Sequence, residues 1–483
     1  MSMMPISEKA STLLVVASLC TIAFLALHGQ GPAEPKQAEQ ARESKSLGQF
    51  GVVGDGMADD SAAIQQAIDS GVGDVVFTKG IYRLTETVVI DLDKVGYTAL
   101  RGNGVARFVM EGPGAAFKFV GTHFKSADPG GFEQNVWDRQ RMPLVDGVAI
   151  EGKHSQASGI AAVGTMQLTV TRTHIRNALH GVHLLENNRN VIVADCHIYE
   201  NRGVGVFYDQ VNLHQSNITN CHISYNSGGG VVSIAGNVRN IHISGCDLES
   251  NMTPDGPATA NVLIDSAGSQ AGTGEVAITG CTIQHNNPST DSANIRIIGR
   301  SAPRGPGRIV REGNVTITGN VLSDVQVNIH LRECRGVAIT GNTIWKGFQH
   351  NLLVEDCSNV VVGPNSLDRN PRYSYGNSLA SNNSVVFRRC ADCTVTGLHL
   401  TNVHRAPAGL LLDHCDRFNV TNCTILDCDN VGILLNEVTA SRVSDCLIRD
   451  DRPESDSVSL RVVGGSENWF ADNSLGTPAE GTD

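Results

Sequence analysis

Residues that can exchange protons or carry charge gather between positions 180 and 296. They are His180, His183, Glu186, Tyr208, Asp209, His214, Asp265 and Arg296. Removing the proton next to a uronate carboxylate requires a base, and cations must stabilise the enolate-like intermediate. His183, Tyr208 and Arg296 are the residues of this group that suit those roles. The segment is therefore a candidate site for lyase or epimerase chemistry.

Glycoside hydrolysis would use the same segment differently, because it needs two carboxylates whose separation sets retention or inversion. Asp209 pairs best with Asp265 or with Glu186. Each residue taken alone is also an ordinary surface polar group, and the clustering is what points to a site. The predicted catalytic set is His183, Tyr208, Asp209, Asp265 and Arg296.

An irregular segment at residues 121–147 supplies candidate substrate-binding groups, namely Trp137, Arg139 and Arg141. An aromatic ring beside two guanidinium groups can stack on a sugar and form a fork with a carboxylate or sulfate. The alternative is a packed loop in which Trp137 is an anchor and the arginines are solvated. Long ordered loops on rigid scaffolds commonly carry function, so Trp137, Arg139 and Arg141 join Glu186 as predicted substrate contacts.

The elements that must position these side chains come from an internal repeat, apolar-x-apolar-x-x-small-x-Ile/Leu, beginning at residue 168. The second apolar residues of its copies are Val170, Val193, Ile218, Ile243, Ile278, Ile317, Ile339, Val362, Val395, Val420 and Val443. Most copies are 22 to 25 residues apart, and three intervals are longer. A fixed period of this length indicates a solenoid.

Within each copy, apolar residues alternate with polar ones, which predicts strands with one buried face. A second short strand follows in most copies, for example at 182–184, 262–264 and 295–297, after corners rich in Asn and Gly. Helical spacing of three and four is absent. The predicted fold is all-β, a single-stranded right-handed parallel β-helix over residues 47–476.

The 13 cysteines follow the repeat. Six occupy one repeat position, and Cys334, Cys357, Cys390 and Cys415 occupy another. Recurrence at one position predicts free thiols stacked in the interior rather than disulfides or a zinc site. Asn320, Asn342 and Asn365 likewise predict a stacked ladder of corner amides.

Arg332, Glu355, Arg388 and Asp413 are expected in one outward column of successive turns. Alternating charge on stacked strands indicates a ladder of ion pairs on a solvated face. A carbohydrate cleft at this column is the alternative reading.

Gly54-Asp55-Gly56, Asp59-Asp60 and the helical pattern of Ile64, Ala67 and Ile68 precede the repeat, followed by Gly80-Ile81-Tyr82. This segment resembles the opening of pectate-lyase-superfamily proteins, including rhamnogalacturonase-like, epimerase-like and tailspike β-helices. The resemblance implies a short helix capping the open end of the solenoid, with Asp55, Asp59 and Asp60 as turn and capping residues.

The same resemblance implies contact with a polysaccharide, often an acidic one, on the outer face of one parallel sheet. The catalytic motifs of polygalacturonases, pectate lyases and epimerases are missing from this sequence. The resemblance therefore predicts the fold more sharply than the reaction.

Residues 12–27 are almost wholly apolar, which is typical of an export signal or an N-terminal anchor. We expect residues 1–29 to be this segment, 30–46 a disordered linker and 477–483 a flexible tail. The expected location is secreted, periplasmic or cell-envelope, and the membrane would be contacted only through an uncleaved N-terminal segment.

The formal charge of -12 and the lack of a basic run exclude nucleic acid as an expected partner. The predicted function is cleavage or modification of a polysaccharide by a lyase or glycoside hydrolase. The alternative is a non-catalytic β-helix that binds glycans or builds the cell surface. No metal site or cofactor is predicted, with Ca²⁺ as the one cation that an acidic substrate could recruit.

Overall fold

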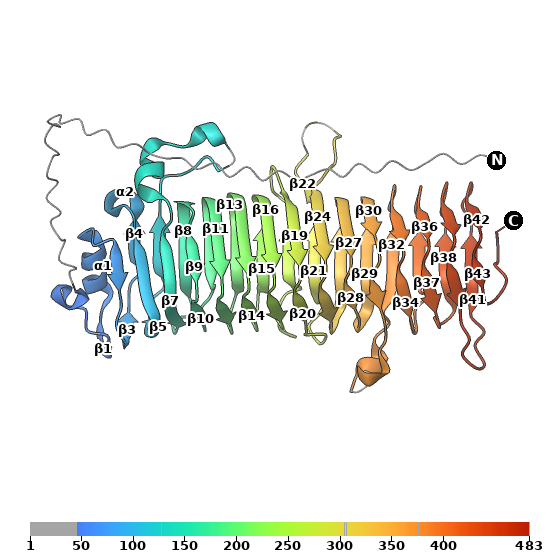
Figure 1. Cartoon of the computed structure of the whole chain (residues 1–483), viewed down its shortest axis with the longest axis horizontal. Coiled ribbons are helices and arrows are strands. Elements are labelled where there is room, and N and C mark those ends of the chain that lie inside the picture. Colours follow the sequence, from blue (N-terminus) through green and yellow to red (C-terminus); the bar gives the residue numbers. More distant parts are fainter. Residues whose placement is uncertain (1–45, 127, 304, 306, 374–375, 483) are drawn as a thin grey trace, which may run out of the picture. The chain divides into compact units, whose positions relative to one another are not determined.

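The computed structural model describes residues 46–126, 128–303, 305, 307–373 and 376–482. The predicted N-terminal export segment and most of the linker lie outside the described residues. Forty-one strands join into one continuous parallel arrangement, and strands β22 and β23 form a separate antiparallel pair. Successive turns lie side by side in sequence order (Figure 1), as a parallel β-helix requires.

Each turn contributes strands to three stacks, here called sheets 1, 2 and 3. Sheet 1 contains β2 (Asp74–Val76), β9 (Thr169–Thr171), β16 (Asn237–Ser244), β19 (Thr273–Thr279), β24 (Gly313–Thr318), β27 (Arg335–Thr340), β30 (Ser358–Val362), β33 (Thr394–Thr396), β36 (Asn419–Thr421), β39 (Arg442–Ser444) and β42 (Trp469–Ala471).

Sheet 2 consists mainly of strands of two or three residues. It contains β1 (Asp55–Asp59), β3 (Gly80–Leu84), β10 (His174–Arg176), β12 (His197–Tyr199), β14 (His222–Ser224), β17 (Asp247–Glu249), β20 (Thr282–Gln284), β25 (Val321–Ser323), β28 (Thr343–Ile344), β31 (Ser366–Leu367), β34 (His399–Thr401), β37 (Thr424–Leu426), β40 (Leu447–Arg449) and β43 (Ser474–Leu475).

Sheet 3 carries most of the predicted catalytic residues. It contains β4 (Val88–Asp91), β6 (Gly114–Val120), β8 (Ala157–Met166), β15 (Gly229–Ile234), β18 (Ala260–Asp265), β21 (Ala293–Ile298), β26 (Val325–Arg332), β29 (Gly347–Glu355), β32 (Ser384–Arg388), β35 (Leu410–Asp413), β38 (Val431–Asn436) and β41 (Val458–Val463). Four long strands bend from one sheet into the next: β5 (Ala99–Met110), β7 (Leu144–Gly152), β11 (Val182–Ala194) and β13 (Val204–Thr219).

In-register pairing stacks identical repeat positions along the axis. Val193 pairs with Val170 and Ile218, and Ile198 with Ile175 and Ile223. These side chains are fully or almost fully buried and belong to one continuous core. Because strand side chains alternate between faces, the intervening residues of each strand point outward. The predicted β-helix is confirmed.

The cysteine prediction is also confirmed for the described residues, whose 12 cysteines are all free and buried. Cys246 donates its backbone N–H to Cys281 Sγ at 3.5 Å, as stacking in one file requires. The asparagine ladder is present as well: Asn320 Nδ2 donates to Asn342 Oδ1 at 3.0 Å, and Asn342 Nδ2 to Asn365 Oδ1 at 2.9 Å.

Helix α1 (Ser61–Asp69) packs against the first turn through buried Ile64, Ala67 and Ile68. Its Gln65 amide donates to Val89 O and accepts from Val89 N, so the side chain satisfies the free edge of β4. The expected capping of the helix N-terminus by the side chain of Asp60 is wrong, because this side chain makes no hydrogen bond to the first turn of the helix. Asp60 instead accepts from Val53 N and Gly54 N.

Asp59 fills the capping role, because its Oδ1 accepts from both the backbone N and the hydroxyl of Ser61. Asp55 accepts from Met57 N and Ala58 N and closes a turn, and these bonds lower the pKa of Asp55. Asp55 and Asp59 therefore have turn and capping contacts, as the resemblance implied, whereas Asp60 binds the backbone of the preceding loop.

Short helices punctuate the loops. They are η1 (Leu47–Phe50), α2 (Leu92–Val95), η2 (Pro129–Gly131), the π-helical turn η3 (Val136–Gln140), η4 (Pro371–Tyr373) and η5 (Ser378–Ala380). Among the described residues, no helix is both long enough and apolar enough to cross a membrane. At the C-terminal end, Glu480 bridges to Arg461, and Thr477 Oγ1 accepts from Ser459 N.

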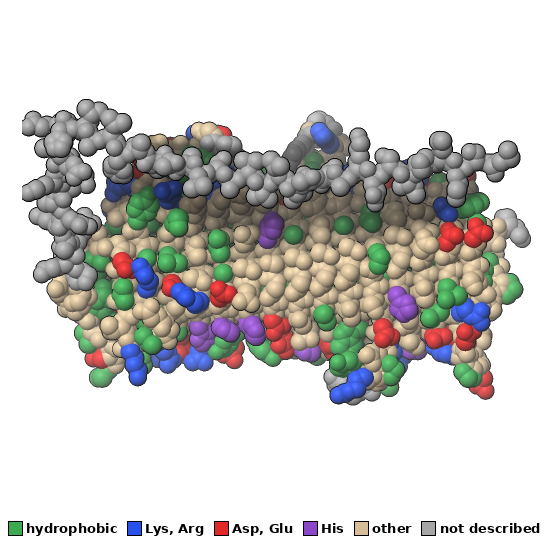
Figure 2. All heavy atoms as spheres, in the orientation of Figure 1, with side chains coloured by type: hydrophobic (Ala, Val, Ile, Leu, Met, Phe, Trp, Pro, Cys, Tyr) green, Lys and Arg blue, Asp and Glu red, His purple; other side chains and the backbone are tan. Residues whose placement is uncertain are grey.

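Charged side chains are distributed unevenly over the surface. The face shown in Figure 2 has a broad band of mainly uncharged atoms, with acidic, basic and imidazole side chains concentrated near its lower margin.

Candidate functional site

The outward face of sheet 3 brings His183 and Asp209 together. They lie on the neighbouring strands β11 and β13, in which Leu184 pairs with Tyr208 and both of these side chains point inward. His183 precedes Leu184 and Asp209 follows Tyr208, so both point outward. His183 Nε2 is 3.0 Å from Asp209 Oδ2, and both side chains remain partly exposed. A carboxylate held against an imidazole orients the ring and stabilises its protonated form, so the pair is suited to proton transfer.

Aromatic rings hold His183 in place. Its ring stacks on Phe207 with the planes 11° apart and the centroids 5.2 Å apart. The ring of His180 lies 4.8 Å from that of His183. His180 Nδ1 accepts from Val204 N, and burial together with the neighbouring His183 lowers the pKa of His180 to about 4. His180 is therefore a neutral support at neutral pH, and His183 is the imidazole that faces the surface.

His183 also borders an open depression of about 420 Å³ on the outer face of sheet 3. This volume falls within the range of small-molecule sites. The lining residues are Thr87, Val89, Gly114, Ala115, Lys118, Ser158, Ala161, His183 and Leu185. Lys118, Ala161 and His183 occupy one outward column, with Lys118 two strands from His183, roughly 10 Å apart by strand spacing. A cation and a base thus flank one depression.

Tyr208 does not belong to this site, and its assignment as a catalytic residue is wrong. It lies in the inward column of β13, is fully buried, and its hydroxyl bonds to Ser216 Oγ. Burial raises the pKa of Tyr208. Alternation along the strand places Tyr208 and Asp209 on opposite faces, so only one of them can reach a substrate.

Asp265 and Arg296 lie on the same outward face but further along the solenoid. Asp265 is two strands from Asp209 in one column, and its Oδ1 accepts from Ala267 N. Arg296 is four strands from His183 and is buried. Its guanidinium donates to Asp291 and to His330 Nδ1. The structure therefore separates them from the His183–Asp209 pair.

Arg296 begins a chain of polar contacts across successive strands of sheet 3. His330 Nε2 is 3.1 Å from Glu355 Oε2, which is followed by ion pairs from Arg388 to Glu355 at 3.6 Å and to Asp413 at 3.8 Å. The register places Arg332, Glu355, Arg388 and Asp413 in one column. The expected ion-pair ladder is thus present from Glu355 to Asp413.

The loop at residues 121–143 does not reach the His183–Asp209 pair through its hydrogen bonds. Those bonds run to α2 and to the corner within β11, where that strand bends: Arg139 donates to Lys94 O, and Asn187 donates to His123 O. Arg141 lies over the Trp137 ring at 4.7 Å, so the predicted aromatic–guanidinium pairing forms, although away from the proposed base. Glu186 is exposed at this corner with φ 54°.

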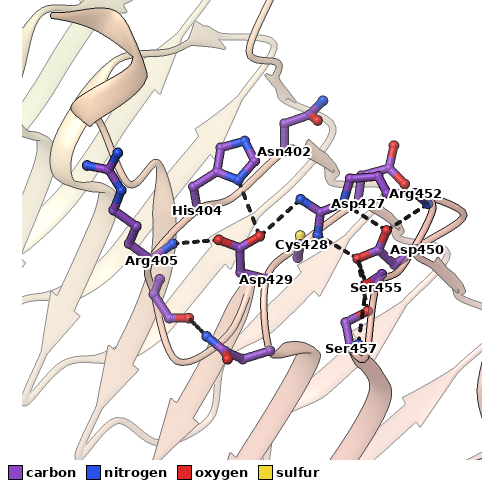
Figure 3. Close-up of polar contacts among 12 residues, drawn as sticks. Asn402, His404, Arg405, Asp427, Cys428, Asp429, Asp450, Arg452, Ser455 and Ser457 are labelled. Carbon is purple, nitrogen blue, oxygen red and sulfur yellow. Dashed lines mark hydrogen bonds and ion pairs between the residues drawn. The ribbon is translucent and has the colours of Figure 1, made fainter.

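Another imidazole–carboxylate pair, which was not predicted, lies near the C-terminal end (Figure 3). His404 Nδ1 is 3.3 Å from Asp429 Oδ1, which also accepts from Arg452 Nη1 at 3.0 Å, while Arg405 N donates to Oδ2. Arg452 turns in the same cluster toward Asp450, a carboxylate that also accepts from Ser455 and Ser457. These contacts brace the loop at residues 450–457.

Sequence reasoning also missed Lys118, Phe207 and His330, and it assigned no role to His180. Lys118 had a readable signal, because it stands between Phe117 and Phe119 in an apolar strand and so must point outward. Within the described part of the chain, no group of three or more His, Cys, Asp or Glu is arranged to hold a metal ion.

Two family models match this chain. One describes a right-handed β-helix region and matches residues 136–283, and the other describes a periplasmic copper-binding protein, NosD, and matches residues 261–478. They support the right-handed parallel β-helix that the resemblance to pectate-lyase-superfamily proteins predicted. No protein with a curated function matches the sequence.

Similar solved structures include tailspike protein 3 of bacteriophage CBA120, with 12% identity and a TM-score of 0.44. The match covers 90% of this chain and 59% of the tailspike chain. Another is the A-module of mannuronan C-5 epimerase AlgE6 from Azotobacter vinelandii (14%, 0.44; 89% and 98% covered). A third is a mutant tailspike of E. coli bacteriophage HK620 in complex with pentasaccharide (14%, 0.48; 88% and 78%). At these scores the similarities carry no argument about activity.

Proposed function

We propose that this chain, a right-handed parallel β-helix of the kind found in the pectate-lyase superfamily, binds an acidic polysaccharide on sheet 3 and modifies it by proton abstraction. The observation that carries the proposal is the His183–Asp209 pair beside a depression that also contains Lys118. An imidazole, an orienting carboxylate and a nearby ammonium are the groups that this reaction needs.

In the proposed step, the Nε2–H of His183 donates a hydrogen bond to Asp209, so that the unprotonated Nδ1 acts as the base. Nδ1 takes the proton from the ring carbon next to the uronate carboxylate, and the electron pair moves into the carboxylate to form an enolate-like intermediate. Lys118 neutralises the carboxylate, and Asp209 stabilises the imidazolium. In an elimination, the electron pair returns to form the ring double bond as the bond to the glycosidic oxygen breaks, and the departing oxygen takes a proton from water. In an epimerisation, water instead delivers a proton to the other ring face. In both cases the imidazolium then releases its proton to the hydroxide that remains.

Retaining glycoside hydrolysis fits the geometry less well. It needs two carboxylates about 5 Å apart. Asp209 and Asp265 are two strands apart in one column, which corresponds to roughly 10 Å. One of these carboxylates bonds to His183 and the other closes its own turn. Proton abstraction by the imidazole therefore has the better geometric support.

The test is an activity screen of the purified chain on uronate-containing and neutral glycans, following the ultraviolet absorbance of unsaturated uronates, reducing ends and proton exchange from the sugar. We expect turnover of a uronate polymer that is lost in His183→Gln. The matched control is His222→Gln, because His222 faces Asp247 at 4.0 Å on sheet 2, outside this depression. Equal activity of His183→Gln and the native chain would overturn the proposal.

The second candidate function is glycan binding without catalysis. It is favoured by the partly exposed apolar residues Phe207 and Leu263, which lie in the outward column between His183 and Arg296 and offer a surface for the C–H faces of sugars. Solenoid faces form extended binding surfaces of this kind. Binding of a glycan with no product in any assay, and with unchanged affinity in His183→Gln, would select this function.

We also propose that the protein acts in the cell envelope or outside the cell, directed there by the apolar segment at residues 12–27. The match to a model described as periplasmic supports this location. Fractionation of cells that express the full chain, compared with a chain lacking residues 1–29, tests it. Retention of the full chain in the cytoplasm would contradict the proposal.

A further inference from the structure

A basic hairpin stands out on this acidic protein. Strands β22 (Arg300–Ser301) and β23 (Val310–Arg311) pair antiparallel, and the hairpin projects from the corner between sheets 3 and 1 (Figure 1). Residues 299–312 contain four arginines and one glutamate, although the formal charge of the whole chain is -12. Such local reversal of charge gives an acidic protein one place that attracts anions.

The hairpin overhangs an open cavity of about 560 Å³. Its lining residues are Arg239, Gly274, Glu275, Val310, Arg311, Glu312, Gly313, Asn314, Arg335, Gly336 and Asn359. Arg239 pairs in register with Gly274, and Gly313 with Arg335. A Cβ at Gly274 would lie 2.8 Å from Gly313 O, so these two glycines are adjacent. Gly274 and Gly313 therefore form a part of the cavity floor that has no side chains, and Arg239 and Arg335 flank it on the neighbouring strands.

The carboxylates of this cavity already have partners. Glu275 accepts from Asn240 Nδ2 at 2.8 Å, and Glu312 accepts from Ser301 Oγ at 2.9 Å and lies 3.4 Å from Arg239 Nη2. Arg239 also donates to three backbone carbonyls, those of Val238, Ala271 and Gly272. Arg239 and both glutamates are thus engaged within the protein.

Two guanidinium groups at the cavity are not neutralised in this way. Arg311 and Arg335 form no ion pair with any residue that the structure describes, and the Nε of Arg311 is buried without a hydrogen-bond partner. Arg335 makes one long contact, from Nη1 to Ser358 Oγ at 3.5 Å. A buried donor without a partner is costly, and a ligand oxygen would satisfy it.

We propose that this cavity is a second carbohydrate-binding site, specific for a carboxylate-bearing sugar, in which Arg311 and Arg335 bind the carboxylate. Guanidinium groups recognise carboxylates through paired N–H donors. The volume exceeds what a bare ion needs and fits a sugar unit, with Asn314 and Asn359 available to the hydroxyl groups. The site involves other strands than those of His183 and Asp209 and does not rest on the proposed reaction.

Calorimetric titration of the full chain with an oligogalacturonate, its carboxyl-reduced neutral counterpart and inorganic sulfate tests the assignment. We expect the oligogalacturonate to bind, and Arg311→Gln and Arg335→Gln each to weaken this binding roughly tenfold or more, since a charge-assisted contact is lost. Arg335→Lys keeps the positive charge but lacks the paired N–H donors of a guanidinium, so we expect a smaller loss of affinity than in Arg335→Gln. His183→Gln separates this site from the proposed reaction and should leave the arginine-dependent binding unchanged.

Arg389→Gln is the matched control, because Arg389 is an exposed arginine already paired with Asp356 at 2.8 Å, outside this cavity. Native-like thermal unfolding of each variant shows that the fold is intact. Unchanged affinity in Arg311→Gln and Arg335→Gln, or no binding by the native chain, would overturn the site. Equal binding of sulfate or of the carboxyl-reduced sugar would overturn its specificity for a carboxylate-bearing sugar.

Discussion

The pairs His183–Asp209 and His404–Asp429 have the same chemistry and opposite surroundings. The first borders a depression of about 420 Å³, and the imidazole is the partner that bonds Asp209 Oδ2. In the second, Asp429 also accepts from Arg405 N and from Arg452, and Arg452 in turn donates to Asp450 (Figure 3). An imidazole–carboxylate pair is thus a candidate for catalysis where it borders open space, and a brace where the carboxylate also binds an arginine and a backbone N–H.

The largest expected effect tests this contrast directly. His183→Gln should lower turnover of a uronate polymer by about 10²- to 10⁴-fold, since general-base catalysis contributes that much. His404→Gln should leave turnover unchanged. Steady-state kinetics of both variants check the prediction, and an equal loss of turnover in the two would remove the distinction between the pairs.

Stability should show the reverse pattern. Asp450 is nearly buried and accepts from Arg452, Ser455 and Ser457, and the Arg452 hydrogen bond holds its pKa well below the ordinary value. Asp450→Asn should lower the free energy of unfolding by about 2 kcal/mol, because it removes charge-assisted hydrogen bonds from Arg452, which keeps its pair with Asp429.

Asp209→Asn is the matched variant for Asp450→Asn. It removes one partner of a partly exposed pair and should cost about 1 kcal/mol or less. Denaturant unfolding compares the two variants. A larger loss of stability in Asp209→Asn would mean that the His183 pair, too, is a structural brace.

Acid should destabilise the surroundings of His183 through His180. The folded pKa of His180 is about 4, against an ordinary value of 6.5, because of burial and the neighbouring His183. Between these values the unfolded chain binds a proton that the folded chain does not, so stability falls as pH falls from 6.5 to 4. The loss is about 3 kcal/mol for this group.

The contribution of His180 can be isolated with His180→Gln, whose unfolding free energy should depend less on pH over the same interval. His197→Gln, which changes a histidine of sheet 2, should retain the native pH dependence. Identical slopes for His180→Gln and the native chain would show that His180 is not buried in its neutral form.

The smallest expected effect concerns Tyr208. Tyr208→Phe removes a buried hydroxyl that bonds to Ser216, so we expect a loss of about 1 kcal/mol in stability and no change in turnover. Thermal unfolding and kinetics of the same preparation check both points. A large loss of turnover with native stability would return Tyr208 to the list of catalytic candidates.

Much of the fold could be predicted because the repeat is local information. Residues like Val193, Cys221 and Ile223 occur at the same position of successive turns, and this recurrence predicts that the turns stack in register. Of the predicted catalytic residues, only His183 and Asp209 lie in contact with each other. The prediction for Tyr208 was wrong because alternate residues of β13 face the interior. Val206 and Tyr208 share this buried face, and Asp209 lies on the outer face.

The sequence by itself determined the winding of the chain, the files of buried cysteines and asparagines, and the face on which each strand residue lies, because period and alternation are properties of neighbouring residues. Only the tertiary structure decided which outward residues meet. The loop at 121–143 turned to the corner and α2, Arg296 turned to Asp291 and His330, and the hairpin at 300–311 came to lie over Gly274 and Gly313. Loop paths and side-chain pairings depend on contacts between distant turns, and the repeat pattern does not encode them.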